Sequence, residues 1–232
     1  MLPRLARLRR TALDLLFPRW CLGCGREGSL ICPACRRRLP ELKSPICPRC
    51  GTPQPGGILC PACVSHQHKI DGIRSPFRFE AVIRQAIHQL KYKNLRSIAE
   101  PLARLLSDYL TAYPVPGEVL VPVPLHRKRL RERGYNQSEL LSKELGKLVK
   151  LSVMADCIIR QRHTPPQIRA ASASERRSNV ADAFTCRNNL RNKKIILIDD
   201  VATSGATLDA CAAALKDVGA SSVWGLTLAR EV

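Results

Sequence analysis

The segment IILIDDVATSGAT, residues 195–207, decides the fold of this 232-residue chain. Four apolar residues precede two carboxylates, Asp199 and Asp200, and a stretch of small and hydroxyl-bearing residues follows them. This pattern predicts a strand over 194–198, a loop over 201–206, a helix over 207–218 that ends before Gly219, and a second strand over 223–229. Adjacent strands joined by a helix indicate a parallel α/β sheet with a right-handed crossover.

The loop of this unit has the chemistry of a site for a phosphate and a ribose. Backbone N–H groups at a helix start favour a phosphate, and the acids lie at the carboxyl end of a strand, where they can accept hydrogen bonds from sugar hydroxyls. A buried strand with an ordinary acidic helix cap is the alternative, but two adjacent carboxylates are costly to bury. The segment lacks the Gly-x-x-x-x-Gly-Lys pattern of a P-loop. The predicted site consists of Asp199, Asp200, Ala202, Thr203, Ser204, Gly205, Ala206 and Thr207.

Eight of the 11 cysteines form Cys-x-x-Cys pairs, which are Cys21/Cys24, Cys32/Cys35, Cys47/Cys50 and Cys60/Cys63. Two such pairs supply the four thiolates of a tetrahedral zinc site, so four pairs predict two structural zinc ions. Seven residues separate the first two pairs and nine the last two, which favours consecutive sites, while a crossed pairing of first with third and second with fourth stays open. A disulfide framework would need a secretion signal, which we do not find near the N-terminus, and regular pairs in a Pro/Gly-rich segment favour metal over redox chemistry.

The three remaining cysteines, Cys157, Cys186 and Cys211, are each alone in the sequence, and we expect buried or incidental thiols.

A change of composition after Cys63 predicts two units, an N-terminal helix and double zinc ribbon over 1–66 and an α/β domain over 67–232. Apolar spacing predicts helices over 80–91, 96–112 and 138–149, and short strands over 73–79, 119–123 and 154–159. The polar stretch 160–180 has no apolar periodicity, and loops of this length are usually disordered or act as lids over functional sites. Residues 2–17 predict an amphipathic helix that docks on the rest of the protein, with an anionic membrane or DNA as the alternative surface.

The chain is strongly basic, with 38 Lys and Arg against 19 Asp and Glu and a net charge of +19. A charge of this size attracts polyanions, so nucleic acids and phosphorylated metabolites are the expected partners, although a basic surface also aids solubility. Aromatic residues make up 4% of the chain, which argues against an extended aromatic platform for bases. The candidates for nucleic-acid or pyrophosphate contacts are Lys91, Arg127, Lys128, Arg129, Arg131 and Arg133.

Membrane insertion is not expected, because no run approaches the roughly 20 apolar residues of a spanning helix. We therefore expect a cytoplasmic protein, for which peripheral contact with a membrane stays possible.

Residues 195–207 resemble the signature of type I phosphoribosyltransferases, in which apolar residues and two acids precede a Thr/Ser-Gly-x-Thr loop. Ser204, where Thr is common, and the small Ala202 depart mildly from it. The cysteine pairs, VPVPLHRKRLRERGYNQ (121–137), ERRSNVADAF (175–184, with Arg176 and Asn179) and this signature together resemble the ComF family of competence-related proteins, which includes GntX-type members. The resemblance covers nearly the whole chain.

The resemblance implies that the carboxylates bind the ribose of 5-phosphoribosyl-1-pyrophosphate (PRPP) and that the following loop holds its 5-phosphate. It also implies a pyrophosphate loop over 121–127, a hood over 160–179, and Mg²⁺ that bridges pyrophosphate and ribose oxygens. Lys91 either helps to bind the pyrophosphate or is an exposed helix lysine.

Two functions follow from the resemblance. The first is a PRPP-binding factor that assists the uptake or use of external single-stranded DNA, together with proteins of the DNA-uptake machinery. The alternative is an active Mg²⁺-dependent phosphoribosyltransferase in nucleotide metabolism, for which the sequence identifies neither the acceptor nor a catalytic residue.

Overall fold

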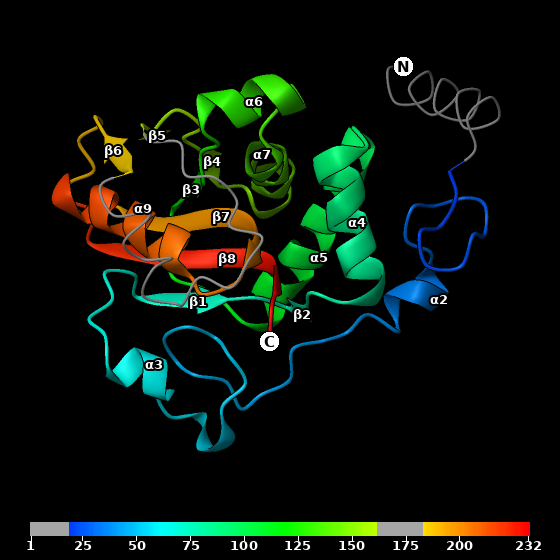
Figure 1. Cartoon of the computed structure of the whole chain (residues 1–232), viewed down its shortest axis with the longest axis horizontal. Coiled ribbons are helices and arrows are strands. Elements are labelled where there is room, and N and C mark those ends of the chain that lie inside the picture. The colour runs from blue at the N-terminus through cyan, green and yellow to red at the C-terminus, as the bar shows by residue number, and fades with distance from the viewer. Residues whose placement is uncertain (1–18, 162–182) are drawn as a thin grey trace.

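The computed structural model describes residues 19–161 and 183–232, and within these residues a six-stranded parallel sheet forms the centre of the protein (Figure 1). The strands follow the order β1-β8-β7-β3-β4, and β2 extends the edge by pairing with the end of β8. Their bounds are Gly72–Arg74 for β1, Phe77–Arg78 for β2, Val119–Pro122 for β3, Ser152–Val153 for β4, Lys194–Ala202 for β7 and Ser222–Arg230 for β8. A separate antiparallel ribbon pairs β5 (Ile158–Arg160) with β6 (Phe184–Cys186).

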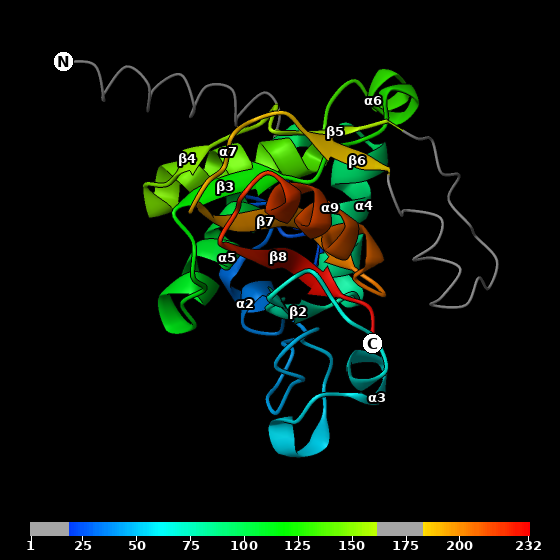
Figure 2. The same ribbon diagram turned by 90° about the vertical axis from the view of Figure 1, so that its left-hand side faces the viewer.

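Helices cover both faces of this sheet (Figures 1 and 2). Helices α4 (Ala81–Tyr92), α5 (Ala99–Ala112) and α7 (Gln137–Val149) pack on the face that carries Ile196 and Ile198, whereas α9 (Ala206–Asp217) packs on the face that carries Ile195 and Leu197. Successive side chains of a strand point to opposite faces, so the continuous apolar run of β7 is buried on both sides. The long unbroken run in the sequence is therefore the signature of a central strand.

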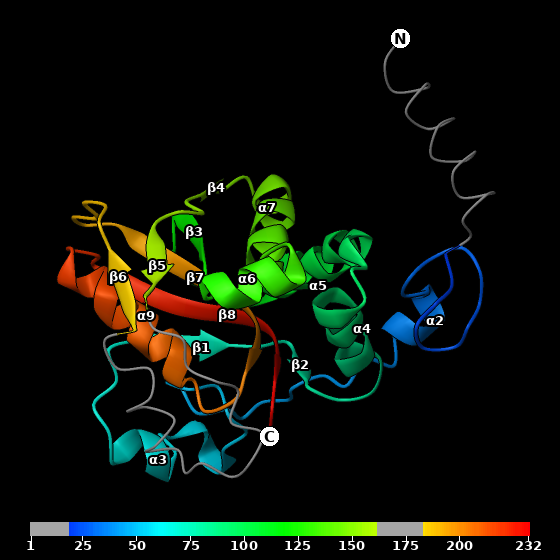
Figure 3. The same cartoon turned by 45° about the horizontal axis from the view of Figure 1, so that its top comes forward.

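The charge block between β3 and α7 forms a short helix, α6 (Arg127–Arg133). The side chain of His126 caps its start by accepting a hydrogen bond from the backbone of Lys128, and Gly134 ends it at a φ of 77°. Figure 3 shows α6 on the side of the sheet from which the carboxyl ends of β3 and β7 emerge. A 3-10 turn, Arg96–Ile98, precedes α5.

The two cysteine-rich segments contact different parts of the α/β domain (Figure 1). The first contains α2 (Pro33–Arg36) and buries Leu30 in the same core as α4, while Gly23 lies so close to Val82 that a Cβ at Gly23 would be 2.7 Å from that side chain. The second contains a 3-10 turn, Pro55–Gly57, and α3 (Pro61–Val64). It attaches to the sheet edge, where Ile73 donates a 2.7 Å backbone hydrogen bond to Arg49.

Several predicted elements are confirmed within a few residues, namely those for α4, the 3-10 turn with α5, β3, α7, α9 and β8. Others are wrong in detail: the strand predicted over 73–79 is broken between β1 and β2, and the one over 154–159 is two short strands, β4 and β5, that pair in different sheets. Strand β7 continues through Ala202, so Asp199 and Asp200 lie inside the strand and not beyond its end. The amphipathic helix predicted over 2–17 and most of the hood over 160–179 lie outside the described residues.

In the part of the chain that the structure describes, no helix has both the length and the apolar content needed to cross a bilayer.

Candidate functional site

The two carboxylates of β7 are held by residues from two different helices. Asp200 is 2% exposed, and its Oδ1 lies 2.8 Å from Nζ of Lys91 at the end of α4. Oδ1 of Asp199 accepts a 2.8 Å hydrogen bond from Ser138 Oγ, at the start of α7, and one of 2.9 Å from the backbone N–H of Asp200. Among the described residues, Oδ2 of Asp200 is buried without any hydrogen-bond partner. Such an oxygen can accept a hydrogen bond from a bound ligand.

Burial and mutual repulsion govern the protonation of this pair. Burial raises the pKa of Asp199 to about 7, the charge of Asp200 adds to the rise, and Lys91 and Ser138 oppose it. Burial alone would lower the pKa of Lys91, but the adjacent Asp200 outweighs it, so the net pKa is raised and the ammonium stays protonated. Lys91 thus lies beside two neighbouring carboxylates, and their combined negative charge favours additional positive charge or hydroxyl donors.

The segment Tyr135–Asn136 sets the positions of Ser138 and Lys91. The Tyr135 hydroxyl donates to the carbonyl of Leu90, the residue before Lys91. Asn136 Nδ2 donates to the carbonyl of Val123 at 3.0 Å, and its Oδ1 accepts from the backbone of Ser138 at 3.1 Å, which caps α7. The buried Asn136 therefore ties the start of α7 to the end of β3, and the capping geometry aims Ser138 at Asp199.

The loop after β7 leads into the N-terminus of α9. Gly205 caps this helix at a φ of 79° and has no side chain with which to cap it, and the first N–H group of the 12-residue helix, that of Ala206, makes only a long 3.4 Å hydrogen bond to Ser204 Oγ. A Cβ at Gly205 would lie 2.8 Å from Ile73 Cδ1, and the positive φ is one that residues other than glycine rarely adopt. Thr203 is exposed, while Ser204 and Thr207 are partly exposed. The arrangement suits an anion that is bound by backbone amides and hydroxyls.

The β5–β6 ribbon reaches the same end of the sheet. Burial and the neighbouring Arg129 lower the pKa of the Arg160 guanidinium, whereas Asp199 opposes this change, so the end of β5 lies beside the carboxylates. At the other end of the ribbon, Sγ of Cys157 is 3.5 Å from Sγ of Cys186. Sequence reasoning missed this contact, because 29 positions separate the two residues and neither belongs to a Cys-x-x-Cys pair. Cys211 is fully buried in α9.

A basic pocket of about 490 Å³ adjoins the carboxylates and shares Lys91 with them. It lies between the end of α4 and α6, and we call it the α4–α6 pocket; its lining is Lys91, Tyr92, Asn94, Arg129, Glu132, Arg133 and Tyr135. Of the predicted basic contacts, Arg129 and Arg133 line the pocket, while Arg127, Lys128 and Arg131 point to solvent from α6. The expectation that Lys91 is an exposed helix lysine is wrong, since its side chain is only 22% exposed and pairs with Asp200.

The eight paired cysteines form two clusters. Sγ atoms of Cys21, Cys24, Cys32 and Cys35 lie within 4.8 Å of one another, and so do those of Cys47, Cys50, Cys60 and Cys63. The clusters therefore combine consecutive pairs, as the short connections favoured, and not crossed ones. Four convergent cysteine sulfurs with no other ligand type fit a closed tetrahedral zinc site.

Backbone amides prepare two of these sulfurs for a metal. Burial raises the pKa of Cys21, but the backbone N–H of Cys32, 3.3 Å from its Sγ, and other amides outweigh burial and lower the pKa to about 6. In the second cluster, the backbone N–H of Cys60 donates to Sγ of Cys47 at 3.4 Å. Burial raises the pKa of Cys47, but this and other amides outweigh burial and lower the pKa to about 6. Because the thiolate is the metal ligand, these bonds favour the bound state.

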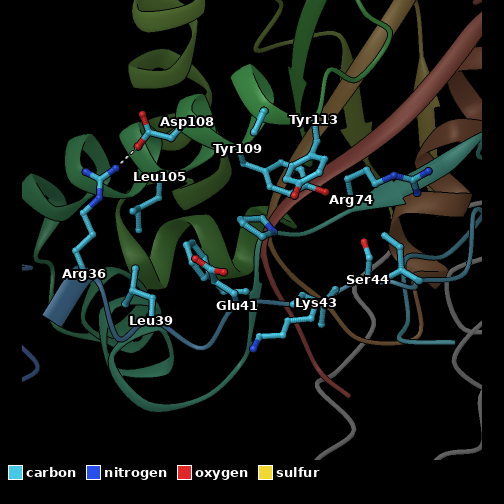
Figure 4. A pocket seen from close by; sticks show the side chains of 15 residues that line it. Arg36, Leu39, Glu41, Lys43, Ser44, Arg74, Leu105, Asp108, Tyr109 and Tyr113 are labelled. Carbon is cyan, nitrogen blue, oxygen red and sulfur yellow. Dashed lines mark hydrogen bonds and ion pairs between the residues drawn. The ribbon is translucent and has the colours of Figure 1, made fainter. Parts of the chain in front are cut away.

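A cavity of about 520 Å³ lies away from the carboxylates, between the linker that joins the two clusters, the β1–β2 edge and α5 (Figure 4). Tyr109 of α5 and Tyr113, which directly follows this helix, contact each other there with ring centroids 5.2 Å apart, and Arg36 pairs with Asp108 at its rim. Its lining, within the residues that the structure describes, includes no residue of β7 or α9. It is therefore separate from the predicted phosphate and ribose site.

Comparisons with known proteins match both parts of the chain. A double zinc ribbon domain model matches residues 12–64, and a phosphoribosyl transferase domain model matches residues 131–231. Competence protein F of Haemophilus influenzae is 30% identical over 212 residues, covering 86% of this chain and 90% of that protein. Competence protein ComFC of Bacillus subtilis is 31% identical over 219 residues (87% and 84%), and DNA utilization protein YhgH of Escherichia coli K12 is 30% identical over 209 residues (87% and 91%).

Solved structures with the same kind of domain are more distant. Glutamine PRPP amidotransferase from B. subtilis aligns at 16% identity and a TM-score of 0.38 over 55% of this chain and 26% of that chain. Purine phosphoribosyltransferase from Pyrococcus horikoshii aligns at 14% identity and a TM-score of 0.35 over 55% and 71%. The assignment of a phosphoribosyltransferase-like fold with an N-terminal double zinc ribbon rests on the domain models and on the sheet and cysteine clusters described above.

Proposed function

The chain belongs to the ComF family of competence-related proteins, and on this premise we propose that its α/β domain, residues 67–232, binds PRPP while its basic surface binds single-stranded DNA that is taken up or used by the cell. The observation that carries the proposal is the buried Oδ2 of Asp200, which has no hydrogen-bond partner in residues 19–161 and 183–232 and lies next to the second carboxylate, Asp199. A ribose diol supplies hydroxyl donors for such oxygens.

The neighbouring elements support the rest of the ligand. Its 5-phosphate would be bound by the loop over 203–207 and by the first amides of α9, where Gly205 has no side chain to cap the helix. The pyrophosphate would lie at the turn after β3, where His126 starts α6. These contacts account for the residues singled out in the sequence, and they add Ser138 and Asn136 as residues that position Asp199.

The carboxylates also fit Mg²⁺, which prefers oxygen ligands. Mg²⁺ would enter the site with PRPP beside Asp199 and Asp200, and the ion would offset the negative charge of the pyrophosphate. Zinc has a separate and structural role in the two cysteine clusters.

Two observations support the binding of DNA, namely the net positive charge of the chain and the names of the proteins to which it is similar. The chain carries a net charge of +19, and α6 places Arg127, Lys128 and Arg131 on the surface beside the proposed PRPP site. Relatives named competence proteins and DNA utilization proteins match most of the chain. Basic side chains that neutralise phosphates give binding that tolerates many sequences and weakens with salt.

Calorimetric titration with Mg²⁺ and PRPP tests the proposal. We expect Asp199→Asn/Asp200→Asn to lower the affinity at least roughly tenfold, since hydrogen bonds to charged groups contribute about 1.5–3 kcal/mol. Asp217→Asn, at the exposed far end of α9, is the matched control and should bind PRPP like the parent protein. Equal affinity in the double variant would show that the carboxylates are not the binding site.

Transfer of the phosphoribosyl group is a second candidate function, favoured by the raised pKa of Asp199, because groups that titrate near pH 7 are suited to proton transfer. Release of pyrophosphate from PRPP, measured with and without single-stranded DNA, separates the candidates. Release that depends on an added base or amine would establish catalysis. PRPP binding without release would leave the protein as a PRPP-binding factor.

A further inference from the structure

The α4–α6 pocket combines positive charge with an exposed aromatic ring. Three of its lining residues are cationic and one is acidic, and its volume of about 490 Å³ lies within the usual range of ligand sites. Arg129 and Arg133 are four residues apart on α6, so both point from one helix face into the same space. Tyr92 is 63% exposed, although its ring has a large apolar surface.

The pocket is also held in place before any ligand binds. Arg133 donates a hydrogen bond to Gln137 Oε1, and its guanidinium lies over the Tyr92 ring, 5.5 Å from the centroid. Arg96 covers Tyr135 in the same way at 4.5 Å. The Tyr92 ring also contacts His88, with ring centroids 4.8 Å apart, and stays 63% exposed. Cations beside an exposed aromatic ring are the features with which proteins bind the phosphate and the base of single-stranded nucleic acids.

We propose that the α4–α6 pocket binds one nucleotide of a single-stranded nucleic acid, with the base on Tyr92 and the phosphate at Arg129 and Arg133, and that Lys91 couples this pocket to the carboxylates of the PRPP site. The inference rests on the proposed function, because it assigns a place and a regulation to the DNA contact. Lys91 both lines the pocket and pairs with Asp200, so it belongs to the two sites at once.

The sign of the coupling follows from the charges. Without a ligand, Lys91 is the cation that compensates Asp200, at 2.8 Å. Ligand hydroxyls and a divalent cation at the carboxylates take over that compensation, which frees the ammonium of Lys91 to turn toward a phosphate in the pocket. PRPP with Mg²⁺ therefore strengthens nucleic-acid binding, and by linkage the nucleic acid strengthens PRPP binding by the same factor.

Fluorescence anisotropy of a labelled oligo(dT) tests the pocket with full-length, zinc-loaded protein. We expect Tyr92→Ala to weaken oligo(dT) binding roughly fivefold or more, the lower end of the loss found for one stacked base. Tyr113→Ala is the matched control, since Tyr113, directly after α5, is 61% exposed but lines the cavity of Figure 4. Equal losses of oligo(dT) affinity in the two variants, or no loss in either, would overturn the assignment of this pocket to nucleic acid. Competition by free dTMP as strong as that by the oligonucleotide would assign the pocket to mononucleotides instead.

The same assay with added Mg²⁺ and PRPP tests the coupling. Saturating PRPP is expected to tighten oligo(dT) binding roughly fivefold, the lower end of ordinary coupling between sites. Lys91→Met should remove this effect, whereas Lys147→Met, which deletes an exposed lysine of α7, should retain it. Calorimetry on the same samples separates the failures: PRPP that binds without changing DNA affinity overturns the coupling alone, and PRPP that does not bind overturns the proposed function.

Discussion

Ser138 at the start of α7 donates a 2.8 Å hydrogen bond to Asp199 in the middle of the sheet, across 61 positions of the sequence. The bond fixes one carboxylate of an adjacent pair, while Lys91 fixes the other. Asn136 caps α7 through the backbone of Ser138 and binds the end of β3, so the serine is itself held by the fold. The site is therefore organised by helix termini as much as by the strand that carries the acids.

Removal of this hydroxyl tests its role as a positioning group. In Ser138→Ala, Asp199 loses a donor that favours its charged form, so its pKa should rise further above about 7 and PRPP affinity should fall most at low pH. Calorimetric titrations of Mg²⁺ and PRPP between about pH 6 and 8.5 measure the change. Ser142→Ala is the control, because that buried hydroxyl donates to the carbonyl of Ser138, one turn along α7. A uniform loss of affinity at all pH values would contradict an effect through Asp199.

The stability of the protein should depend on the protonation of Asp199. Its pKa is raised from the ordinary value of 3.8 to about 7, so the native state binds a proton more tightly than the unfolded state, and stability falls as pH rises between these values. Asp199→Asn removes this loss. Without PRPP we expect the variant to be about 2 kcal/mol more stable than the parent at about pH 8.5, and we expect the difference to shrink at about pH 6. Each tenfold change in proton affinity corresponds to about 1.36 kcal/mol. The expected difference is smaller than the full pKa shift would give, because the site around Asp199 relaxes when the residue is charged. Urea unfolding with saturating zinc measures the difference, and a value that is constant with pH would refute the prediction.

Much of the site was predictable because its chemistry is local in the sequence. The apolar run of β7, the adjacent acids and Gly205 define a strand, a ligand end and a helix start within 13 residues. The regular cysteine spacing likewise predicted two consecutive clusters, which the structure brings together. In both places, neighbours in the sequence are neighbours in space.

The missed contacts join distant segments. Nothing near Lys91 indicates that its ammonium pairs with Asp200, and nothing near Ser138 indicates Asp199, because both contacts arise from the packing of α4 and α7 on the sheet. The cations of the run Arg127–Arg133 were predicted only as candidate nucleic-acid or pyrophosphate contacts and not as a helix, since five cations in seven residues conceal the helical signal. Its boundaries were nonetheless present, as a capping His126 and Gly134.

Replacement of Gly205 should weaken PRPP binding by more than a general loss of stability would explain. In Gly205→Ala the Ile73 side chain can yield to the new Cβ, but a φ of 79° is strained for alanine, so the backbone before α9 is expected to shift and to misalign the amides proposed for the 5-phosphate. We expect PRPP affinity to fall roughly tenfold or more, as the misplaced amides lose charge-assisted hydrogen bonds. Gly219→Ala is the matched control, since it sits at the other end of α9 at a φ of 98° and 3.1 Å from Arg191. We expect Gly219→Ala to lose about as much stability as Gly205→Ala but to keep the PRPP affinity of the parent. Equal losses of PRPP affinity in the two variants would argue against a phosphate site at Gly205.

Arg230 connects the second cysteine cluster to the sheet and lies close enough to influence how tightly that cluster holds zinc. This residue of β8 is 4% exposed, and its Nε donates a 2.8 Å hydrogen bond to Thr52 beside Cys50. Burial lowers the pKa of its guanidinium, while the sulfurs of Cys50, Cys63 and the other two ligands oppose this, so the cation stabilises negative charge on the cluster. Four thiolates around one Zn²⁺ leave a net charge of about −2, for which Arg230 is a buried counter-ion.

Arg230→Met should therefore release one zinc at a lower chelator concentration than the parent protein, by roughly tenfold, the smaller end of losses seen when an outer partner of a metal site is removed. The zinc in the first cluster should be unaffected, so a two-step release measured with a colorimetric indicator is the expected result. Arg78→Met, an exposed arginine on β2, is the control and should release both ions like the parent. Since Met keeps the apolar volume of the arginine stem, simple loss of packing is limited. If Arg230→Met released both ions together at the parent's concentration, the charge of Arg230 would have no part in holding the metal, and the contact with Thr52 would serve only to attach the second ribbon to the sheet.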